Sequence, residues 1–199
     1  MGAVAYDAAD GFFDDHVVWG TVLDEGRGAL PYSLIHGESL VACASWALGE
    51  AGVTAVDVGT AWEVVVDAGT PVVLHDALCP MTPPEFIADC VRRAAAAEVV
   101  VVGVRPVTDT VKTVEQGPEG DTVGETVDRD GLAALASPVV LPPSAVRDLP
   151  DWPGDDLRVL VDLLRGSGHE VELVEAPPQG RRVTGPDDVR LVEALTAER

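Results

Sequence analysis

Lysine is nearly absent from this sequence of 199 residues. Lys112 is the only one, so the 13 basic residues comprise one lysine and 12 arginines, against 34 acidic residues. The formal net charge is −21, and a surface of that sign repels nucleic acid and anionic membranes, so neither is expected as a partner. The charge also makes a triphosphate harder to hold unless a local basic pocket exists. Alternatively, the acidity serves only solubility, or reflects adaptation to salt or to a GC-rich genome.

Cysteines are few, and the hydrophobic runs are short. The three cysteines, Cys43, Cys79 and Cys90, form no Cys-x-x-Cys pair and are odd in number, so we expect buried free thiols rather than a structural disulfide. No apolar run approaches the ~20 residues that a bilayer span requires. Residues 1–15 are acidic, lack the basic region of a secretory signal and are expected to form a flexible leader. These absences predict a cytoplasmic protein.

What is present is a globular composition, with 47% hydrophobic residues, in which strand and helix signals alternate. Strands are expected at 17–23, 53–58, 64–66, 72–74, 98–104 and 170–174, and helices at 39–50, about 82–97, 131–136, about 155–164 and 186–197. The run at 98–104 is rich in valine, which is typical of a strand in the middle of a parallel sheet. The alternation predicts a single α/β domain over residues 1–199 with an open, mostly parallel sheet.

Residues 107–128 interrupt this alternation. Two extended runs, 107–114 and 122–127, flank a turn of sequence Gln-Gly-Pro-Glu-Gly-Asp at 116–121. No helical signal lies between them. The pattern predicts a β-hairpin inserted into the α/β fold, and we expect a β-arm over residues 106–132.

Three short motifs stand out by their order and spacing. The strand at 72–74 continues into His75-Asp76-Ala77, the hairpin carries Asp-Thr-Val-Lys at 109–112 and Thr-Val-Asp-Arg-Asp-Gly-Leu at 126–132, and Arg-Val-Thr-Gly-Pro at 182–186 precedes the last helix. With these motifs the chain resembles the 2-C-methyl-D-erythritol 4-phosphate cytidylyltransferase family from about residue 70 to its C-terminus. The hairpin motif is the most specific of the three.

The resemblance implies a Rossmann-like α/β fold of the nucleotide-diphospho-sugar transferase type with a protruding β-hairpin arm. It also implies a homodimer in which the arms of two subunits interlock and each arm completes the partner's substrate site. The implied reaction transfers CMP from CTP to the phosphate of methylerythritol phosphate, releases pyrophosphate and uses Mg²⁺. This reaction belongs to isoprenoid precursor synthesis.

Four residues are candidates for the metal and the acceptor substrate. Nucleotidyl transfer needs positioning and positive charge around the phosphorus under attack. Asp76 follows a strand, where one carboxylate can hold Mg²⁺; alternatively it makes only a local turn. Arg129, Thr110 and Ser137 are candidates to hold the sugar phosphate by charge-assisted hydrogen bonds. Alternatively, Arg129 is a solvated residue of the arm and Thr110 an ordinary β-branched strand residue.

Two arginines are the catalytic candidates, Arg27 and Arg182. Arg182 also serves as a substrate-binding candidate and stands where the family usually has Lys, which keeps the charge but changes the geometry. The family's nucleotide loop after the first strand carries an Arg and a Pro-Lys pair, whereas the loop here is shorter and Arg27 is its only cation. Asp24 and Glu25 place negative charge where phosphates would lie, and Tyr32 stands in place of the Lys.

Two further departures affect the nucleotide side. The family has a helix between the positions of residues 58 and 72 that helps to hold the cytosine, and here we expect only a short strand. Cys79 stands where an Arg usually follows His-Asp-Ala.

These losses favour a divergent, catalytically impaired homologue that binds a small phosphorylated ligand or a protein partner. The alternatives are an active nucleotidyltransferase with a rebuilt loop that moves CMP or another NMP to a sugar or polyol phosphate, and a structural dimer whose arm only joins the subunits.

Overall fold

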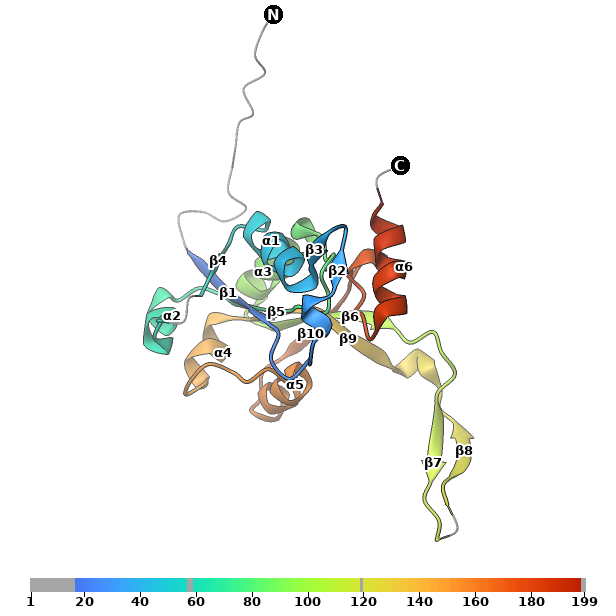
Figure 1. Cartoon of the computed structure of the whole chain (residues 1–199). Coiled ribbons are helices and arrows are strands. Elements are labelled where there is room, and N and C mark those ends of the chain that lie inside the picture. The colour runs from blue at the N-terminus through green and yellow to red at the C-terminus, as the bar shows by residue number, and fades with distance from the viewer. Residues whose placement is uncertain (1–16, 57–58, 119, 198–199) are drawn as a thin grey trace, which may run out of the picture.

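The valine-rich runs form the strands of a six-stranded sheet in the computed structural model, which describes residues 17–56, 59–118 and 120–197 (Figure 1). The strands are β1 (Val18–Leu23), β4 (Val53–Ala55), β5 (Val72–Asp76), β6 (Val100–Pro106), β9 (Ala133–Leu141) and β10 (Val171–Glu175), in the spatial order β10-β6-β9-β5-β1-β4. Strand β9 is antiparallel to both of its neighbours, and the other pairs are parallel. The predicted open, mostly parallel α/β sheet is therefore confirmed.

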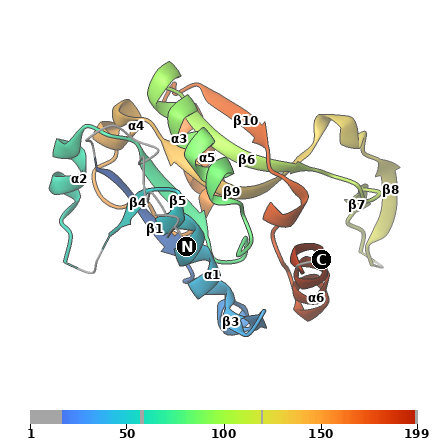
Figure 2. The ribbon, with the colours of Figure 1, turned by 90° about the horizontal axis from the view of Figure 1, so that it is seen from above.

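Alternation along the strands divides the core into two layers. Val72 and Leu74 of β5 point to one face of the sheet and Val73 to the other, because successive side chains of a strand alternate. Helices α1 (Leu40–Glu50) and α3 (Pro84–Ala97) cover the face of Val73, whereas α2 (Trp62–Ala68), α4 (Pro143–Asp148) and α5 (Leu157–Gly166) cover the opposite face (Figure 2).

A smaller cluster attaches the C-terminal helix beside the sheet. It joins η1 (Leu30–Tyr32), the two-stranded β2 (Leu34–Ile35) and β3 (Glu38–Ser39), and α6 (Pro186–Thr196), which follows η3 (Pro178–Gly180). Ile35, Leu40 and Val192 are fully buried where these elements meet. This packing holds the segment just before α6 near the end of β5, since the Val183 amide donates to the Leu78 carbonyl at 2.7 Å.

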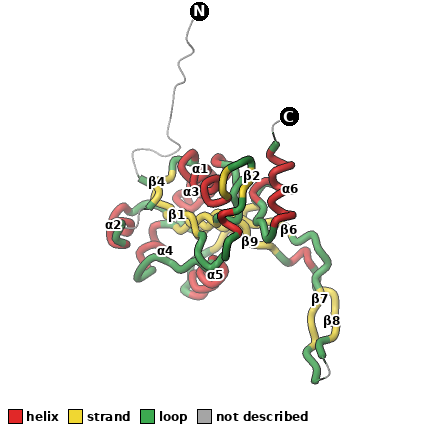
Figure 3. The backbone as a smooth tube through the Cα atoms, in the orientation of Figure 1, coloured by secondary structure: helices red, strands yellow, loops and turns green. Residues whose placement is uncertain are grey.

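The hairpin extends away from the rest of the protein (Figure 3). Within the described residues, strands β7 (Lys112–Glu115) and β8 (Thr122–Thr126) pair only with each other, and η2 (Arg129–Gly131) leads from them into β9. Val114 and Val123 are 64% and 78% exposed. An isolated two-stranded ribbon is marginal in water, so the exposed valines identify a surface that lacks packing partners within this chain's described residues.

Two sequence predictions were wrong. The run 64–66, predicted as a strand, lies in helix α2, where Trp62 and Val65 are buried. The structure therefore has a helix in the interval where we expected it to be missing. Residues 131–136, predicted as a helix, are the end of η2 and the start of β9.

Other boundaries need smaller corrections. Helix α3 begins at Pro84, two residues after the predicted start, with Pro83 at its N-cap position; the Thr82 hydroxyl donates to the Cys79 carbonyl. The expected leader at 1–15 and the end of the strand predicted at 53–58 lie outside the described residues. As predicted, Cys43, Cys79 and Cys90 are free thiols; the latter two are buried and Cys43 is half-buried.

Candidate active site

The carboxyl ends of β1 and β5 form the edge of a cavity of about 560 Å³. From β1 the chain passes to β4 on one side and then to β5 on the other, so its direction across the sheet reverses at β1. Ligands of open α/β sheets bind outside the carboxyl ends of the strands at such a switch point. Asp76, the last residue of β5, lies opposite Leu23 of β1 and lines the cavity.

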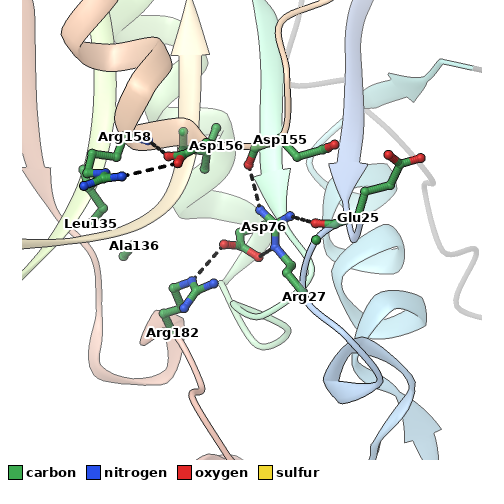
Figure 4. A pocket seen from close by; sticks show the side chains of 11 residues that line it. Glu25, Arg27, Asp76, Leu135, Ala136, Asp155, Asp156, Arg158 and Arg182 are labelled. Atoms are coloured by element: carbon green, nitrogen blue, oxygen red, sulfur yellow. Dashed lines mark hydrogen bonds and ion pairs between the residues drawn. The ribbon is translucent and has the colours of Figure 1, made fainter.

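Asp76 is the centre of the hydrogen-bond network (Figure 4). One carboxylate oxygen, Oδ1, accepts from Arg27 Nε at 2.7 Å and from the Leu78 amide at 2.9 Å. The other, Oδ2, accepts from Arg182 Nε at 2.9 Å. The side chain of Asp76 is only 5% exposed. The two arginines come from opposite ends of the sequence and are bridged by a single buried carboxylate.

This network sets the pKa of the carboxyl group. Burial alone would raise the pKa of Asp76, but the hydrogen bonds from Arg27, the Leu78 amide and Arg182 outweigh it, so the pKa lies below its ordinary value. Asp76 is therefore ionised at neutral pH and neutralises part of the two guanidinium charges.

The loop after β1 presents Arg27 between two glycines in the left-handed region. Gly26 and Gly28 have φ of 70° and 61°, a conformation that costs other residues of the order of 1–2 kcal/mol. The tight turn directs Arg27 back to Asp76. The arginine also donates from Nη1 to the Glu25 carbonyl at 2.6 Å and from Nη2 to the Asp155 carbonyl at 3.2 Å. All three guanidinium nitrogens of Arg27 therefore donate to protein acceptors.

Arg182 differs from Arg27 in its availability. Its side chain is 38% exposed, against 8% for Arg27, and within the described part of the chain its only hydrogen bond is the one from Nε to Asp76. The two terminal nitrogens of Arg182 can thus donate to a ligand in the cavity without breaking a protein contact.

The structure adds residues that sequence reasoning missed. Asp155, Asp156 and Arg158, at the start of α5, line the same cavity as Arg27 and Arg182. Asp156 caps α5, accepting from the amides of Arg158 and Val159, and chiefly the hydrogen bond from Val159 holds its pKa below its ordinary value. An Asp that caps a helix is a common pattern, so the sequence signal at these residues indicated the start of a helix and not a binding site.

Ser137 occupies a different position from the other candidates. Its hydroxyl accepts from the Asp76 amide at 2.9 Å and lies 2.6 Å from His75 Nδ1, and the side chain is fully buried. Since the hydroxyl accepts from the amide, its proton is available to Nδ1. In this structure Ser137 therefore supports the end of β5, and its role as a ligand for the sugar phosphate stays a prediction.

His75 is a buried neutral residue beside this site. Burial lowers the pKa of His75 to about 4, against a smaller effect of Asp76 that raises it. Its Nε2 atom is buried and has no hydrogen-bond partner in the part of the chain that the structure describes. With Nδ1 accepting from Ser137, the neutral ring carries its proton on Nε2 as a buried donor without a partner, and a charged ring would add the larger cost of burying a charge.

The two arm candidates lie outside the cavity of their own chain. Thr110 and Arg129 are exposed residues at the base of the arm, and Arg129 Nη1 donates to the Thr108 carbonyl. Neither is among the residues that line the cavity. Their assignment to the substrate stays a prediction, which requires an arm from a second subunit.

The acidic residues of the nucleotide loop separate in the structure. Glu25 lines the cavity, as expected, but Asp24 does not. Asp24 instead accepts a hydrogen bond from the Tyr32 hydroxyl at 2.8 Å, and this bond raises the pKa of Tyr32 above its ordinary value. Tyr32 therefore contacts the loop itself, where a lysine would supply a cation.

A magnesium ion at Asp76 would need ligands from elsewhere. No group of three or more His, Cys, Asp or Glu residues suited to a metal is found among the described residues. Magnesium is commonly held by one or two carboxylates together with water and substrate phosphates. Asp76 fits that pattern only alongside a phosphate, and the magnesium site stays a prediction.

Comparison with known proteins identifies the family of the chain. The family model for "IspD: 2-C-methyl-D-erythritol 4-phosphate cytidylyltransferase" matches residues 42–198. The chain belongs to this family. The match begins after the loop that carries Arg27, so the cytidylyltransferase pattern covers Asp76 and Arg182 but not the first strand and its loop.

Relatives named as this cytidylyltransferase are moderately similar. The protein from Saccharopolyspora erythraea is 31% identical over 135 residues, which are 68% of this chain and 59% of that protein. The one from Nocardia farcinica is 36% identical over 135 residues, covering 67% and 56%. The chain thus spans about three fifths of the length of these relatives.

Solved structures of the family share the fold. The crystal structure of the Thermus thermophilus cytidylyltransferase has a TM-score of 0.64 at 21% identity, over 90% of this chain and 98% of that chain. The Anaerococcus prevotii 4-diphosphocytidyl-2C-methyl-D-erythritol synthase has a TM-score of 0.63 at 13% identity, over 94% and 99%. The predicted Rossmann-like fold is confirmed. No helix in the described ranges is long and apolar enough to cross a membrane.

Proposed function

We propose that this family member binds a small ligand with a single phosphate group in the cavity beside Asp76 and transfers nucleotidyl groups slowly or not at all. The observation that carries the proposal is the state of Arg27, the only cation of the loop after β1. Its three guanidinium nitrogens donate to Asp76 and to the carbonyls of Glu25 and Asp155. A triphosphate would have to break these contacts before it could use the charge.

The charge balance of the cavity supports a monophosphate. Four carboxylates line it (Glu25, Asp76, Asp155, Asp156), against three guanidiniums (Arg27, Arg158, Arg182). The excess is one negative charge before any ligand enters. One phosphate can bind the open nitrogens of Arg182 in a bidentate manner, whereas a triphosphate adds several charges that no further cation of this lining compensates.

The expected effect on catalysis is large. Removing one group that stabilises the transition state in such chemistry costs on the order of 10²–10³ in rate. Here Tyr32 takes the place of a cation and Arg27 is already engaged by the protein. Both effects weaken binding of the nucleoside triphosphate and leave the residues proposed to bind the acceptor phosphate unchanged.

The test compares a monophosphate with a nucleotide. We expect 2-C-methyl-D-erythritol 4-phosphate to raise the melting temperature of the protein, since a ligand of the native state stabilises it, and CTP with magnesium to leave it unchanged. Arg182→Ala should remove the shift. Arg190→Ala, at an exposed arginine of α6 that pairs with Asp187, is the matched control and should keep it. Release of pyrophosphate from CTP at an ordinary enzyme rate, about 1 s⁻¹ or more, would refute the proposal.

The second candidate is an active cytidylyltransferase, favoured by the convergence of Asp76, Arg27 and Arg182 at one point. In that case Arg27 leaves Asp76 for the triphosphate, and Asp76 becomes available to magnesium, which when bound would neutralise charge on the phosphates. The protein would then be a cytoplasmic enzyme of isoprenoid precursor synthesis. Calorimetry with each of the four NTPs and magnesium separates the two candidates. An active enzyme must bind at least one of these nucleotides and give a measurable heat of binding, whereas the impaired homologue should give none.

The proposal includes a homodimer joined through the arms. It is supported by the exposed valines of the arm and by the way the arm extends away from the sheet (Figure 1), which leaves Thr110 and Arg129 outside the lining of their own chain's cavity. Val123→Glu should then convert a dimer into a monomer in sedimentation equilibrium. Arg129→Ala should keep the dimer but weaken binding of the monophosphate. An unchanged affinity would instead indicate an arm that only joins the subunits.

A further inference from the structure

A second cavity, of about 660 Å³, lies apart from the site at Asp76. Its lining comes from α1, the segment 80–85 that leads into α3, and single residues of β3, η3 and α6 (Glu38, Gln179 and Thr196). Helices α1 and α3 cover one face of the sheet (Figure 2). It shares no lining residue with the first cavity. Whatever binds here would therefore not occupy the candidate active site.

The chemistry of this cavity is the opposite of a phosphate site. Its interior is formed mainly by apolar side chains, among them Trp46, Met81 and Pro83, and Trp46 is 63% exposed. Two carboxylates, Glu38 and Glu85, lie in the lining, and no arginine, lysine or histidine does so among the described residues. An apolar surface with an open indole and two carboxylates favours a cation attached to an apolar body.

Several contacts hold the cavity in shape without a ligand. The Thr82 hydroxyl donates to the Cys79 carbonyl at 2.9 Å, and the Thr82 amide donates to the same carbonyl at 3.3 Å. Pro83 and Pro84 restrict the chain that follows. Thr196 donates to the Val192 carbonyl at 2.9 Å within α6. A preformed surface loses little conformational entropy on binding, which is a property of recognition sites.

We propose that this cavity receives an arginine or lysine side chain, with a neighbouring apolar side chain, from a peptide segment of another protein. The cation lies over Trp46 and near Glu38 and Glu85, and the apolar side chain contacts Met81 and Pro83. The net charge of −21 favours association with a basic partner over a second copy of this chain. The proposal does not depend on the function assigned to the first cavity.

Cys43 provides a reporter within the cavity. It is half-buried and lines the cavity, whereas Cys79 and Cys90 are fully buried. Modification of the native full-length protein by N-ethylmaleimide should therefore occur first at Cys43, which peptide mass analysis can verify. A bound peptide should slow this reaction in proportion to occupancy.

The probe is the acetylated, amidated peptide Leu-Arg-Phe-Arg, and its control is the same peptide with citrulline in place of both arginines. Citrulline keeps the shape of arginine and removes the charge. Calorimetry should show binding of the arginine peptide that is at least about tenfold tighter than that of the citrulline peptide at low salt, and only the arginine peptide should protect Cys43. Equal affinity of the two peptides would overturn the proposal.

Variants locate the binding to this cavity. Glu38→Gln and Glu85→Gln should each weaken the arginine peptide about twofold to fivefold, as expected for exposed ion pairs, and Trp46→Leu by a similar factor. Glu63→Gln, which neutralises an exposed carboxylate on α2, should leave the affinity unchanged. An effect of Glu63→Gln as large as that of Glu85→Gln would overturn the proposal, because it would show a general charge effect. So would a change of oligomeric state in Trp46→Leu, which would indicate that a second copy covers this face.

Discussion

Replacing Asp76 by asparagine should destabilise the free protein and strengthen phosphate binding at the same time. The side chain of Asp76 is 5% exposed and accepts from Arg27 and Arg182. Asn keeps the shape but loses the charge, so the guanidinium of Arg27, whose side chain is 8% exposed, remains without its counterion. Breaking a buried ion pair by removing one partner costs about 3–5 kcal/mol. We expect the lower end, because Arg27 keeps two carbonyl acceptors.

The same change removes the competitor of a phosphate. In the wild type a ligand must share Arg182 with Asp76 and cannot use Arg27, whereas in Asp76→Asn both guanidiniums attract an anion. Hydrogen bonds to charged groups contribute about 1.5–3 kcal/mol each. Inorganic phosphate should therefore bind the variant about tenfold or more tightly than the wild type, and should restore part of the lost stability.

The assay is urea unfolding of both proteins with and without phosphate, with sulfate as a second anion. Phosphate should raise the free energy of unfolding of Asp76→Asn more than that of the wild type. Weaker phosphate binding by the variant would refute the reasoning, because it would show that Asp76 organises the two arginines for the anion rather than competing with it. Equal stability of the two proteins would refute the assignment of a buried ion pair.

Three further predictions concern the support of this site. The pKa of His75 is about 4 in the folded protein and near 6.5 when unfolded. The contribution of the neutral ring to stability is therefore complete above about pH 6.5 and is lost as pH falls towards 4. His75→Gln should reduce the dependence of the free energy of unfolding on pH between these values, measured by urea unfolding at a series of pH values. Ser137→Ala leaves the Asp76 amide and His75 Nδ1 without their partner and should cost roughly 2 kcal/mol or more in the same assay, with Ser137→Thr as the conservative control. Gly26→Ala, at φ of 70°, should cost about 1 kcal/mol in the same assay, and an unchanged free energy of unfolding would show that the turn does not depend on this conformation.

Five of the six strands of the sheet, all except β9, could be predicted because apolar, valine-rich runs are typical of buried parallel strands, and the arm could be predicted from its turn residues. The errors have physical causes. The run Val64-Val65-Val66 suits a strand, but Trp62 and Val65 are buried as a helix against the same cluster as Leu149, and Trp62 Nε1 donates to the Leu149 carbonyl. Packing against residues distant in the sequence thus overrode the local preference of valine for strands.

In the second error, tertiary contacts overrode a local preference for helix. Residues 131–136 contain three alanines, which favour a helix. Ala134 instead pairs with Arg105 of β6, and β9 continues to Leu141 between β6 and β5. A strand inserted antiparallel between two parallel ones depends on contacts far apart in sequence, which no local window contains.

The motifs predicted individual residues of the site but not the contacts between them. The sequence placed Asp76 at a strand end and identified Arg27 and Arg182 by position, but could not show that all three form one network, because Arg182 lies 106 residues from Asp76 along the chain. The carboxylates and the arginine at the start of α5 carried no signal beyond helix capping. Their presence in the cavity changes its charge balance, and with it the class of ligand that we propose.

The two arginines differ in the order in which a ligand can engage them. Arg182 is partly exposed and has open donors, while Arg27 is buried and fully bonded. A monophosphate can bind to Arg182 and leave the contact between Arg27 and Asp76 in place. A triphosphate must displace Arg27 as well, which breaks three hydrogen bonds and separates Glu25, Asp155 and Asp76 from a common donor. The selectivity between one phosphate and three therefore depends on whether Arg27 stays on Asp76.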